Sequence, residues 1–326
     1  MRSTIHAICL ILLFSLGSVS PSFGAVNMER GGAVATASIG GTFYVWGAAW
    51  TQLVNEKMKN YNLAVEVTGG GLHNIRLLEQ NEAQFAFLIM PILEEGYNGL
   101  YWAKDKKYQN GRVLFPMYAS FATVWAPQKT GIKNFRDLTG RIVNLAPKGG
   151  APDTYYRRMF ELLGIKPGKI VNSGLSDMVG EMNDGIIEAG VGTGGNPFGP
   201  ALETESTQPI NILDFNREDL DKLAEEMPGW FVGMRPAGGY KNFPEAKPAL
   251  QFWNMCVTHK DLPDDIAYQL TKMFFENIEY FKDVYRPTLE TKPEDILRVK
   301  TTPIHPGAAR YYKEIGLDIP ADRIAK

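Results

Sequence analysis

The sequence predicts an α/β protein built from two lobes of similar design. Strands alternate with helices from Val34 onward, the alternation that produces a parallel sheet with right-handed crossovers. The same succession of strand, glycine turn and helix recurs at residues 142–163, so a second unit repeats the first. At 326 residues and 44% hydrophobic composition, the chain is long enough for two domains of ordinary size.

The first unit places two glycine turns between strands and helices. We expect an apolar strand over Val34–Ile39, a turn at Gly40-Gly41 and a helix for which Thr42 is the N-cap. A second strand, Leu63–Val67, leads through a further turn at residues 68–71 into a second helix. Each turn sets the unsatisfied N–H groups of a helix N-terminus at the carboxyl end of a strand, where an anion can bind.

The later elements follow the same logic. The continuous apolar run Phe85–Met90 is typical of a strand buried on both faces. A helix that follows Gly150 ends at Gly164, and the clearest helix is Asp261–Phe281, with acidic residues at its positive end and one apolar face. The remaining strands are expected at Val113–Ala126, Ile142–Pro147, Ala189–Gly192, Ile210–Phe215 and Phe252–Thr258.

A polar connection at Pro127–Gly131 follows the long strand and predicts a crossing between lobes. We expect residues 25–126 and 245–326 to form lobe I and residues 127–244 to form lobe II. The hinge then lies in the two crossings, near Ala126 and around Tyr240–Ala249.

The N-terminus reads as a secretory signal peptide over residues 1–24, cleaved near Gly24/Ala25. Its apolar core, Ile8–Leu16, is shorter than the roughly 20 residues of a membrane span, although an uncleaved anchor is the alternative. Cys9 falls inside the signal, so Cys256 is left as one unpaired thiol. We therefore expect a monomer in the periplasm.

The composition disfavours several kinds of partner. With 34 basic and 36 acidic side chains and no long run of like charge, nothing indicates a nucleic-acid or anionic-membrane partner. The common hydrolase and zinc motifs are missing from the sequence, and His73, His259 and His305 are spaced as lone residues, which are more often structural than ligands. We expect no enzyme activity, no metal and no cofactor.

One run, Gly190–Gly195, matches G-x-G-x-x-G and has Asp214 near the acidic position of a dinucleotide fingerprint. Pro197 and Pro200 stand where the helix of that fingerprint would begin. An exported protein also meets little dinucleotide. Both points disfavour nucleotide binding.

Glycine turns follow strands at Gly40, Gly69, Gly149 and Gly194. Any one of these could be an ordinary loop glycine, but clefts of open α/β sheets form outside the strand carboxyl ends. Four such turns predict a ligand cleft between the lobes that suits a carboxylate. The predicted ligand-binding residues are Gly40, Gly41, Thr42, Phe43, Tyr44, Thr68, Gly70, Asn74, Met90, Trp125, Lys148, Gly149, Gly150, Ala151, Pro152, Gly194, Gly195 and Asn196.

Four segments, Ile39–Tyr44, Val67–Leu78, Gly131–Val143 and His305–Tyr312, resemble the TAXI-type solute receptors of TRAP (tripartite ATP-independent periplasmic) transporters. The resemblance implies a two-lobed, type II-like periplasmic-binding-protein fold that delivers its ligand to a permease driven by an ion gradient. It implies ligands of the glutamate, glutamine or 2-oxoglutarate class. Carried over by motif, the binding residues would be Gly41 to Tyr44, Gly70, Asn74 and Gly149 to Pro152.

The sequence departs from that family at two expected cleft positions. Ile89-Met90-Pro91 replaces a polar step, and Gly150-Ala151-Pro152-Asp153 replaces a Ser-Gly-Thr step. Losing the partner of a buried polar group costs ~1–3 kcal/mol, which is enough to change ligand preference. Two other functions stay open: a periplasmic sensory protein, and a small-molecule enzyme on the same fold with Asp153 or His73 as its titratable group.

Overall fold

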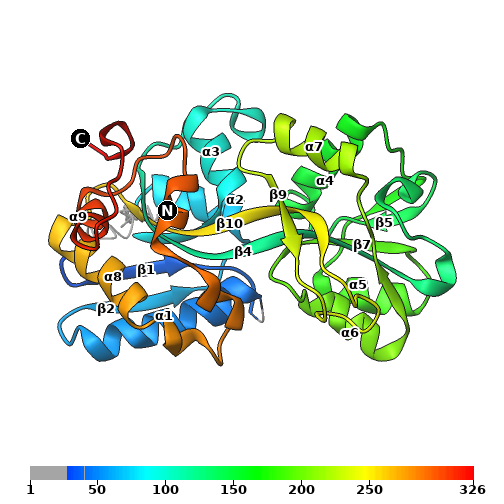
Figure 1. Cartoon of the computed structure of the whole chain (residues 1–326), viewed down its shortest axis with the longest axis horizontal. Coiled ribbons are helices and arrows are strands. Elements are labelled where there is room, and N and C mark those ends of the chain that lie inside the picture. The colour runs from blue at the N-terminus through cyan, green and yellow to red at the C-terminus, as the bar shows by residue number, and fades with distance from the viewer. Residues whose placement is uncertain (1–27, 40) are drawn as a thin grey trace, which may run out of the picture.

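The computed structural model of the chain describes residues 28–39 and 41–326 (Figure 1). The predicted signal peptide, Cys9 and Gly40 lie outside these described residues. Cys256 is a free, buried thiol. Within the described ranges, no helix combines the length and the apolar character that a membrane crossing requires.

A single mixed sheet passes through the molecule in the order β2-β1-β3-β10-β4-β7-β5-β6. Its parallel parts lie at the two ends, where β1 pairs with β2 and β3, and β5 pairs with β6 and β7. The strands are β1 Gly31–Ala35, β2 Asn62–Glu66, β3 Phe85–Ile89, β4 Gly111–Pro127, β5 Ile142–Asn144, β6 Lys169–Val171, β7 Ala189–Gly194, β8 Ile210–Ile212, β9 Phe231–Arg235 and β10 Lys247–His259. The predicted α/β class is confirmed.

Helices cover the sheet in two lobes, with α1, α2, α3, α8 and α9 in one and α4 to α7 in the other (Figure 1). They span α1 Thr42–Lys57, α2 Gly71–Glu79, α3 Met90–Asn98, α4 Ala151–Leu163, α5 Leu175–Asn183, α6 Gly199–Thr207, α7 Arg217–Glu226, α8 Asp264–Glu276 and α9 Pro306–Glu314. Short 3-10 turns are η1 Tyr101–Ala103, η2 Gln128–Thr130, η3 Phe135–Leu138, η4 Ile278–Phe281, η5 Arg286–Glu290, η6 Pro293–Arg298 and η7 Ala321–Arg323.

The two long antiparallel strands β4 and β10 connect the lobes. β4 pairs with β10 over its first part and with β7 and β8 over its last part, so it belongs to both lobes. β10 likewise pairs with β3 at one end and with β9 at the other. The lobe boundaries at residues 126/127 and 244/245 stay predictions.

Several predicted boundaries are wrong in the first unit. β1 begins at Gly31 and ends at Ala35, because its glycines pair with β2 and the chain turns after Thr36, leaving Ile39 exposed. The N-cap of α1 is Gly41, not Thr42. Met90 does not end β3 but begins α3, a helix that the sequence analysis missed although Pro91 suits a first helical turn.

Two further boundaries differ in the second half. The strand predicted at Ile142–Pro147 ends at Asn144, because Ala146 has a positive φ of 59° and the chain turns there. The helix predicted over Asp261–Phe281 is divided, since α8 ends at Glu276 and a separate 3-10 turn follows Asn277.

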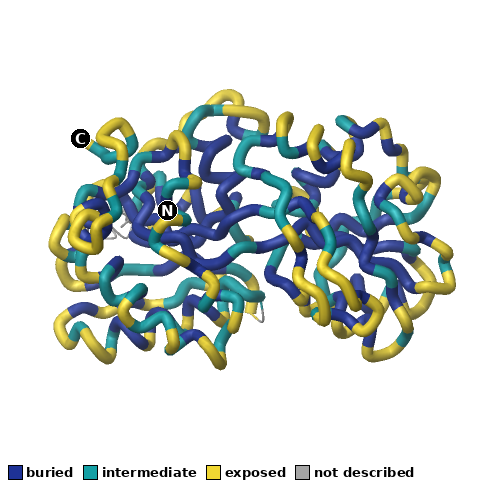
Figure 2. Tube along the Cα trace, in the orientation of Figure 1, coloured by how far each residue is buried: buried dark blue, intermediate teal, exposed yellow. Residues whose placement is uncertain are grey.

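Aromatic packing joins α1 to the sheet and to α8. Trp46 is fully buried, stacks on Phe281 with ring centroids 4.5 Å apart and meets Phe87 of β3 edge-on at 5.2 Å. Its indole N–H donates to Thr288 Oγ1 at 3.0 Å. Buried residues follow the strands through the middle of both lobes (Figure 2). This packing fixes the segment after α8 against the first helix.

A charged contact joins α3 of one lobe to α4 of the other. Glu95 is 1% exposed and receives hydrogen bonds from Arg158 Nη1 at 2.9 Å and from the Tyr155 hydroxyl at 3.2 Å. The Arg158 guanidinium also donates to the Glu226 carbonyl and lies over the Tyr101 ring, 3.3 Å from its centroid. Glu95, Arg158 and Tyr155 therefore join the lobes on this side of β4 and β10.

Replacing Glu95 with glutamine should flatten the pH dependence of stability. Burial raises the pKa of Glu95 to about 7, although Arg158 and Tyr155 oppose the shift. Because the folded pKa lies above the unfolded value, the stabilisation linked to this carboxyl is fully present below the unfolded pKa and is lost as pH rises through about 7. The thermal midpoint of the wild type should fall between about pH 5 and pH 8 by more than that of Glu95→Gln.

Thermal melts followed by circular dichroism at a series of pH values measure this difference. Glu82→Gln, at an exposed position, is the matched control. Equal pH slopes for the wild type and Glu95→Gln would contradict the expectation.

Candidate functional site

The loops that follow β1 and β2 are bound to each other by a buried polar network. The amide of Asn74 is fully buried and donates to Thr36 O at 2.7 Å and to Phe87 O at 2.9 Å, while its oxygen accepts from Thr68 Oγ1 at 2.5 Å. Thr68 Oγ1 also accepts from the N–H of Gly70, whose φ of +89° favours glycine. The polar atoms of Thr68 and Asn74 therefore hold the loops, and the structure assigns them no free group for a ligand.

The N-termini of α1 and α2 at this edge, and that of α4 in the other lobe, leave backbone donors open. α1, α2 and α4 all lack a side-chain cap, and Gly41, Gly70 and Gly150 are their N-cap residues. The predicted residues Thr42, Phe43 and Tyr44 lie half-buried in the first turn of α1. The structure thus brings the first two predicted turns together as an edge of lobe I with free N–H groups.

The third predicted turn, Lys148 to Pro152, lies in the other lobe, and no hydrogen bond among the described residues joins it to the first two. Its helix already has an anion, because the Asp153 carboxylate accepts from Gly149 N and Asn172 Nδ2, both at 3.0 Å, and pairs with Arg157 at 2.7 Å. Burial alone would raise the pKa of Asp153, but these hydrogen bonds and the Arg157 charge outweigh it and lower the pKa. Asp153 is therefore a structural carboxylate.

Two of the predicted site residues lie in the core instead. Trp125 is fully buried, packs on Phe198 with ring centroids 5.7 Å apart and donates its indole N–H to Thr204 Oγ1. Met90 is 5% exposed at the start of α3, with its backbone against Gly229. Trp125 lies within β4 and Met90 directly follows β3, and both side chains are buried in the packed interior.

The glycines of the G-x-G-x-x-G match serve packing. They lie along β7, where a Cβ on Gly190 would come within 2.9 Å of Trp125 and one on Gly194 within 2.8 Å of Phe198. Gly195, directly after the strand, also allows a close contact that a larger residue would block, because a Cβ there would lie 2.1 Å from the Tyr285 hydroxyl. This close approach brings the loop after β7 against the segment that follows α8.

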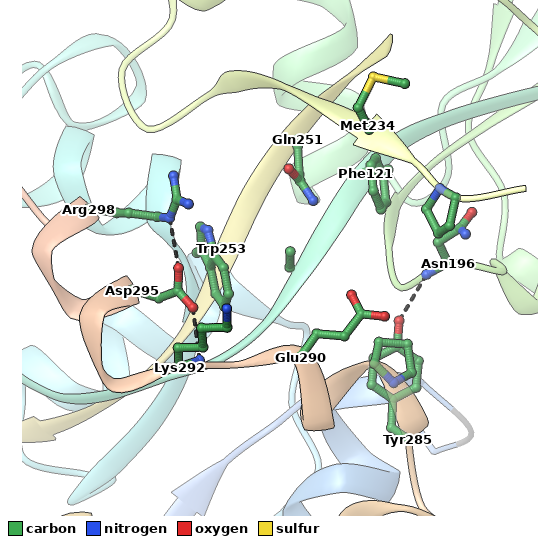
Figure 3. Close-up of a pocket in the computed structure, with 13 residues that line it drawn as sticks. Phe121, Asn196, Met234, Gln251, Trp253, Tyr285, Glu290, Lys292, Asp295 and Arg298 are labelled. Atoms are coloured by element: carbon green, nitrogen blue, oxygen red, sulfur yellow. Dashed lines mark hydrogen bonds and ion pairs between the residues drawn. The ribbon is translucent and has the colours of Figure 1, made fainter. Parts of the chain in front are cut away.

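A cavity of about 370 Å³ lies at this junction, over β4 and β10. Ala119 and Phe121 of β4 and Gln251 and Trp253 of β10 contribute strand side chains to it (Figure 3). Asn196 is the predicted site residue that lines it. The other lining residues are Met234, Pro236, Tyr285, Pro287, Glu290, Lys292, Asp295 and Arg298.

One wall of the cavity comes from the η5–η6 segment and is charged. Arg298 pairs with Asp295 at 3.0 Å and lies 5.6 Å from the Trp253 ring centroid, within the range of a cation–π contact. Glu290 points into the cavity on the same side as Tyr285, and no ion pair in the described chain uses its carboxylate (Figure 3). Lys292 is similarly exposed at the rim.

The opposite wall is backed by a buried arginine. Arg235, the last residue of β9, is 3% exposed and donates to Ala122 O at 2.9 Å, Thr123 Oγ1 at 3.2 Å and Asn196 Oδ1 at 3.4 Å. Its guanidinium lies 5.0 Å from the Phe121 ring centroid. Within the described ranges no carboxylate forms an ion pair with it. Burial lowers the pKa of Arg235, yet arginine stays protonated in proteins.

The sequence analysis missed most of this cavity. Its charged residues occur in short 3-10 turns, which carry no helical or strand periodicity. Arg235 stands alone in the sequence, so nothing local marks it as buried. Among the described residues, no group of three or more histidine, cysteine, aspartate or glutamate side chains is arranged to hold a metal ion.

Comparisons with known proteins agree on the fold. A model of the NMT1-like family matches residues 34–316. The periplasmic binding protein BugD is similar in structure, with a TM-score of 0.50 and 13% identity over 89% of this chain and 99% of BugD. The α/β, two-lobed periplasmic-binding-protein fold expected from the sequence is thereby confirmed.

Two liganded structures are more distant matches. Tv2483 bound to L-arginine has a TM-score of 0.49 and 9% identity, covering 81% of this chain and 94% of that one. The GluR0 ligand-binding core from Nostoc punctiforme, in complex with L-glutamate, has a TM-score of 0.47 and 13% identity, covering 78% of this chain and 99% of that one.

Replacing Asn74 with alanine should destabilise the protein strongly. The change removes the Asn74 donor of Phe87 O and one of the two donors of Thr36 O, which also accepts from Thr68 Oγ1, and each unsatisfied buried group costs ~1–3 kcal/mol. We expect the free energy of unfolding to fall by roughly 3 kcal/mol in urea titrations. Asn60→Ala, at an exposed position in the turn after α1, is the matched control and should leave it almost unchanged. A similar small effect for both variants would refute the role given to Asn74.

Proposed function

The chain belongs to the NMT1-like family, and from this premise we propose that it is a periplasmic solute receptor that binds a small organic anion between its lobes. The comparisons support a ligand-binding receptor in general. We add three points to this general function: the ligand is an anion, it is a carboxylate, and the receptor delivers it to a transporter.

The observation that carries the proposal is the position of the cavity. It lies over β4 and β10, the strands that belong to both lobes, and takes residues from the loop after β7 as well as from the segment after α8. A ligand held there contacts both sides of the hinge at once. Its affinity therefore depends on how the lobes are set, and binding shifts the population toward the arrangement that completes the site.

Three features favour an anion. The helices α1 and α2 present uncapped N-termini at the lobe I edge, Arg235 is a buried cation that forms no ion pair among the described residues, and Lys292 stands at the cavity rim. The resemblance of four sequence segments to TAXI receptors points to carboxylates of the glutamate, glutamine or 2-oxoglutarate class. We accordingly assign the chain to a TRAP transporter, whose permease it would supply from the periplasm after removal of the signal peptide.

Isothermal titration against a panel of carboxylates tests the ligand class. The panel should contain glutamate, glutamine, 2-oxoglutarate and aromatic carboxylates, with neutral sugars and simple cations for comparison. We expect at least one carboxylate to bind in the micromolar range or tighter and to be recovered chemically unchanged. Binding confined to a sugar or a cation would overturn the anion class, and conversion of the ligand would indicate an enzyme.

Filling the cavity should abolish binding. Ala119 is half-buried on β4 and faces the cavity, so Ala119→Phe places a ring in the space that a ligand would occupy. We expect the affinity for the carboxylate found in the panel to fall by roughly 100-fold or more, equivalent to about 2.7 kcal/mol. Ala321→Phe, at an exposed position in η7, controls for added bulk. Unchanged affinity in Ala119→Phe would place the ligand elsewhere in the molecule.

A further inference from the structure

Resting on the proposed function only for the position of the ligand, we propose that Glu95, Arg158 and Tyr155 form a latch that opposes closure of the lobes over the cavity. Glu95 belongs to α3 in one lobe, and Arg158 and Tyr155 belong to α4 in the other. Ligand binding then has to break this contact, so a weaker latch gives a higher affinity.

The sheet narrows to two strands between the lobes. Ala119 and Ser120 of β4 pair with Trp253 and Phe252 of β10, and no third strand in the described chain pairs with these four residues. β9 pairs with β10 only before this stretch and β3 only after it, while β7 pairs with β4 only beyond it. A few residues at the ends of elements usually absorb the motion between domains, so the lobes turn most easily here.

The latch and the cavity lie on opposite faces of this stretch. Trp253 lines the cavity, whereas its neighbour Phe252 faces away and packs on Trp230 with ring centroids 4.8 Å apart. Trp230 in turn meets Tyr155 of the latch edge-on at 5.4 Å. The helices α3, α4 and α7 lie along this side of β4 and β10 (Figure 1). A rotation that brings the lobes together over the cavity therefore pulls the latch apart.

Further contacts between the lobes support the latch on its own face. Arg158 donates to the Glu226 carbonyl of α7 and lies over the ring of Tyr101, whose φ of 49° is costly for a residue other than glycine. The start of α3 meets Gly229 so closely that a Cβ there would lie 2.6 Å from Pro91 N. Closure over the cavity has to loosen these contacts together with the latch.

The carboxyl of Glu95 makes the latch sensitive to pH. Glu94, its neighbour on α3, is turned instead to Thr301. The charged and titratable groups on the other elements packed around Glu95 are Arg158 and Tyr155 of α4, Tyr101 of η1, Glu226 of α7, through its carbonyl, and Arg76 of α2, which lies over Trp102. Arg158 is the charge that acts on Glu95.

The sign of this pH dependence follows from burial. While the latch is formed, burial raises the pKa of Glu95 from 4.5 to about 7, although Arg158 and Tyr155 oppose the shift. Breaking the latch lets water reach the carboxyl and removes the shift, so protonation favours the latched arrangement. As pH rises through about 7 the latch weakens, and ligand affinity should increase by up to about tenfold between roughly pH 6 and pH 8.

Pairs of spin labels, one label in each lobe, measure the latch without any ligand. Lys292→Cys with Ala237→Cys places one pair across the cavity, since Lys292 lines it and Ala237 follows the lining residue Pro236. Lys104→Cys with Glu225→Cys places a second pair at exposed positions on η1 and α7, on the latch face. The native thiol of Cys256 is fully buried and should take no label.

Arg158→Ala breaks the latch, and pulsed electron paramagnetic resonance reads the result. We expect the distance across the cavity to shorten and the distance on the latch face to lengthen. Arg157→Ala is the matched control, because Arg157 pairs with Asp153 inside α4 and should leave both distances unchanged. Unchanged distances in Arg158→Ala, or changes in the same direction on both faces, would overturn the latch whatever ligand the protein binds.

The same distances test the pH dependence. Between about pH 6 and pH 8 the wild type should shift in the direction of Arg158→Ala, whereas Glu95→Gln, which resembles the protonated carboxyl, should not shift. An equal shift in both proteins would contradict the role of Glu95.

Titration with glutamate provides a second measurement. Arg158→Ala should bind glutamate roughly fivefold more tightly than the wild type, or better, and Arg157→Ala should match the wild type. Weaker binding in Arg158→Ala would overturn the latch. If glutamate binds to none of these proteins, that result counts against the ligand class of the proposed function, and the label distances decide on the latch.

Discussion

The pairing of β4 with β10 is the constraint on which the rest of the molecule depends. The two strands pair antiparallel from Gly111 opposite His259 to Phe121 opposite Gln251, then separate so that β4 continues with β7 and β8 while β10 continues with β9. One ladder thereby supplies the centre of the sheet, the connection between lobes and the floor of the cavity. Because side chains alternate along a strand, Gln251 and Trp253 face the cavity while Phe252 faces away from it toward Trp230.

The buried charged groups of this molecule differ in whether they form an ion pair. Asp153 and Glu95 are buried carboxylates with a full set of partners, Arg157 and Gly149 for the first, Arg158 and Tyr155 for the second. Arg235 is as deeply buried, forms no ion pair among the described residues and donates its hydrogen bonds to neutral acceptors. A buried charge costs stability unless its surroundings compensate it, and for Arg235 the compensation comes from these acceptors, from Tyr240 and from the charge of Asp214.

The sequence analysis predicted several elements from a periodic or continuous apolar signal, but it missed α3, α5, α6 and α7. Phe85–Ile89 was recognisable because a strand covered on both faces is apolar throughout, and α4 because Gly164 ends it in a left-handed conformation. Site residues were harder to predict, because an apolar run in the sequence does not show which part of the chain packs against it. Trp125 could not be distinguished from a cleft residue, and Tyr285 meets Asn196 only through contacts that follow from pairing β4 with β10.

Two contacts between the lobes lie on opposite faces of the pair β4 and β10. On one face Glu95 binds Arg158 and Tyr155, and Tyr155 packs on Trp230, which in turn contacts Phe252. On the other face Tyr285 accepts the backbone N–H of Asn196 beside the cavity. A rotation of the lobes about β4 and β10 that opens one contact compresses the other, so the two cannot be optimised independently. The ion pair of Glu95 with Arg158 joins the lobes on its own face, whereas a single hydrogen bond from Asn196 N–H to Tyr285 joins them on the cavity face.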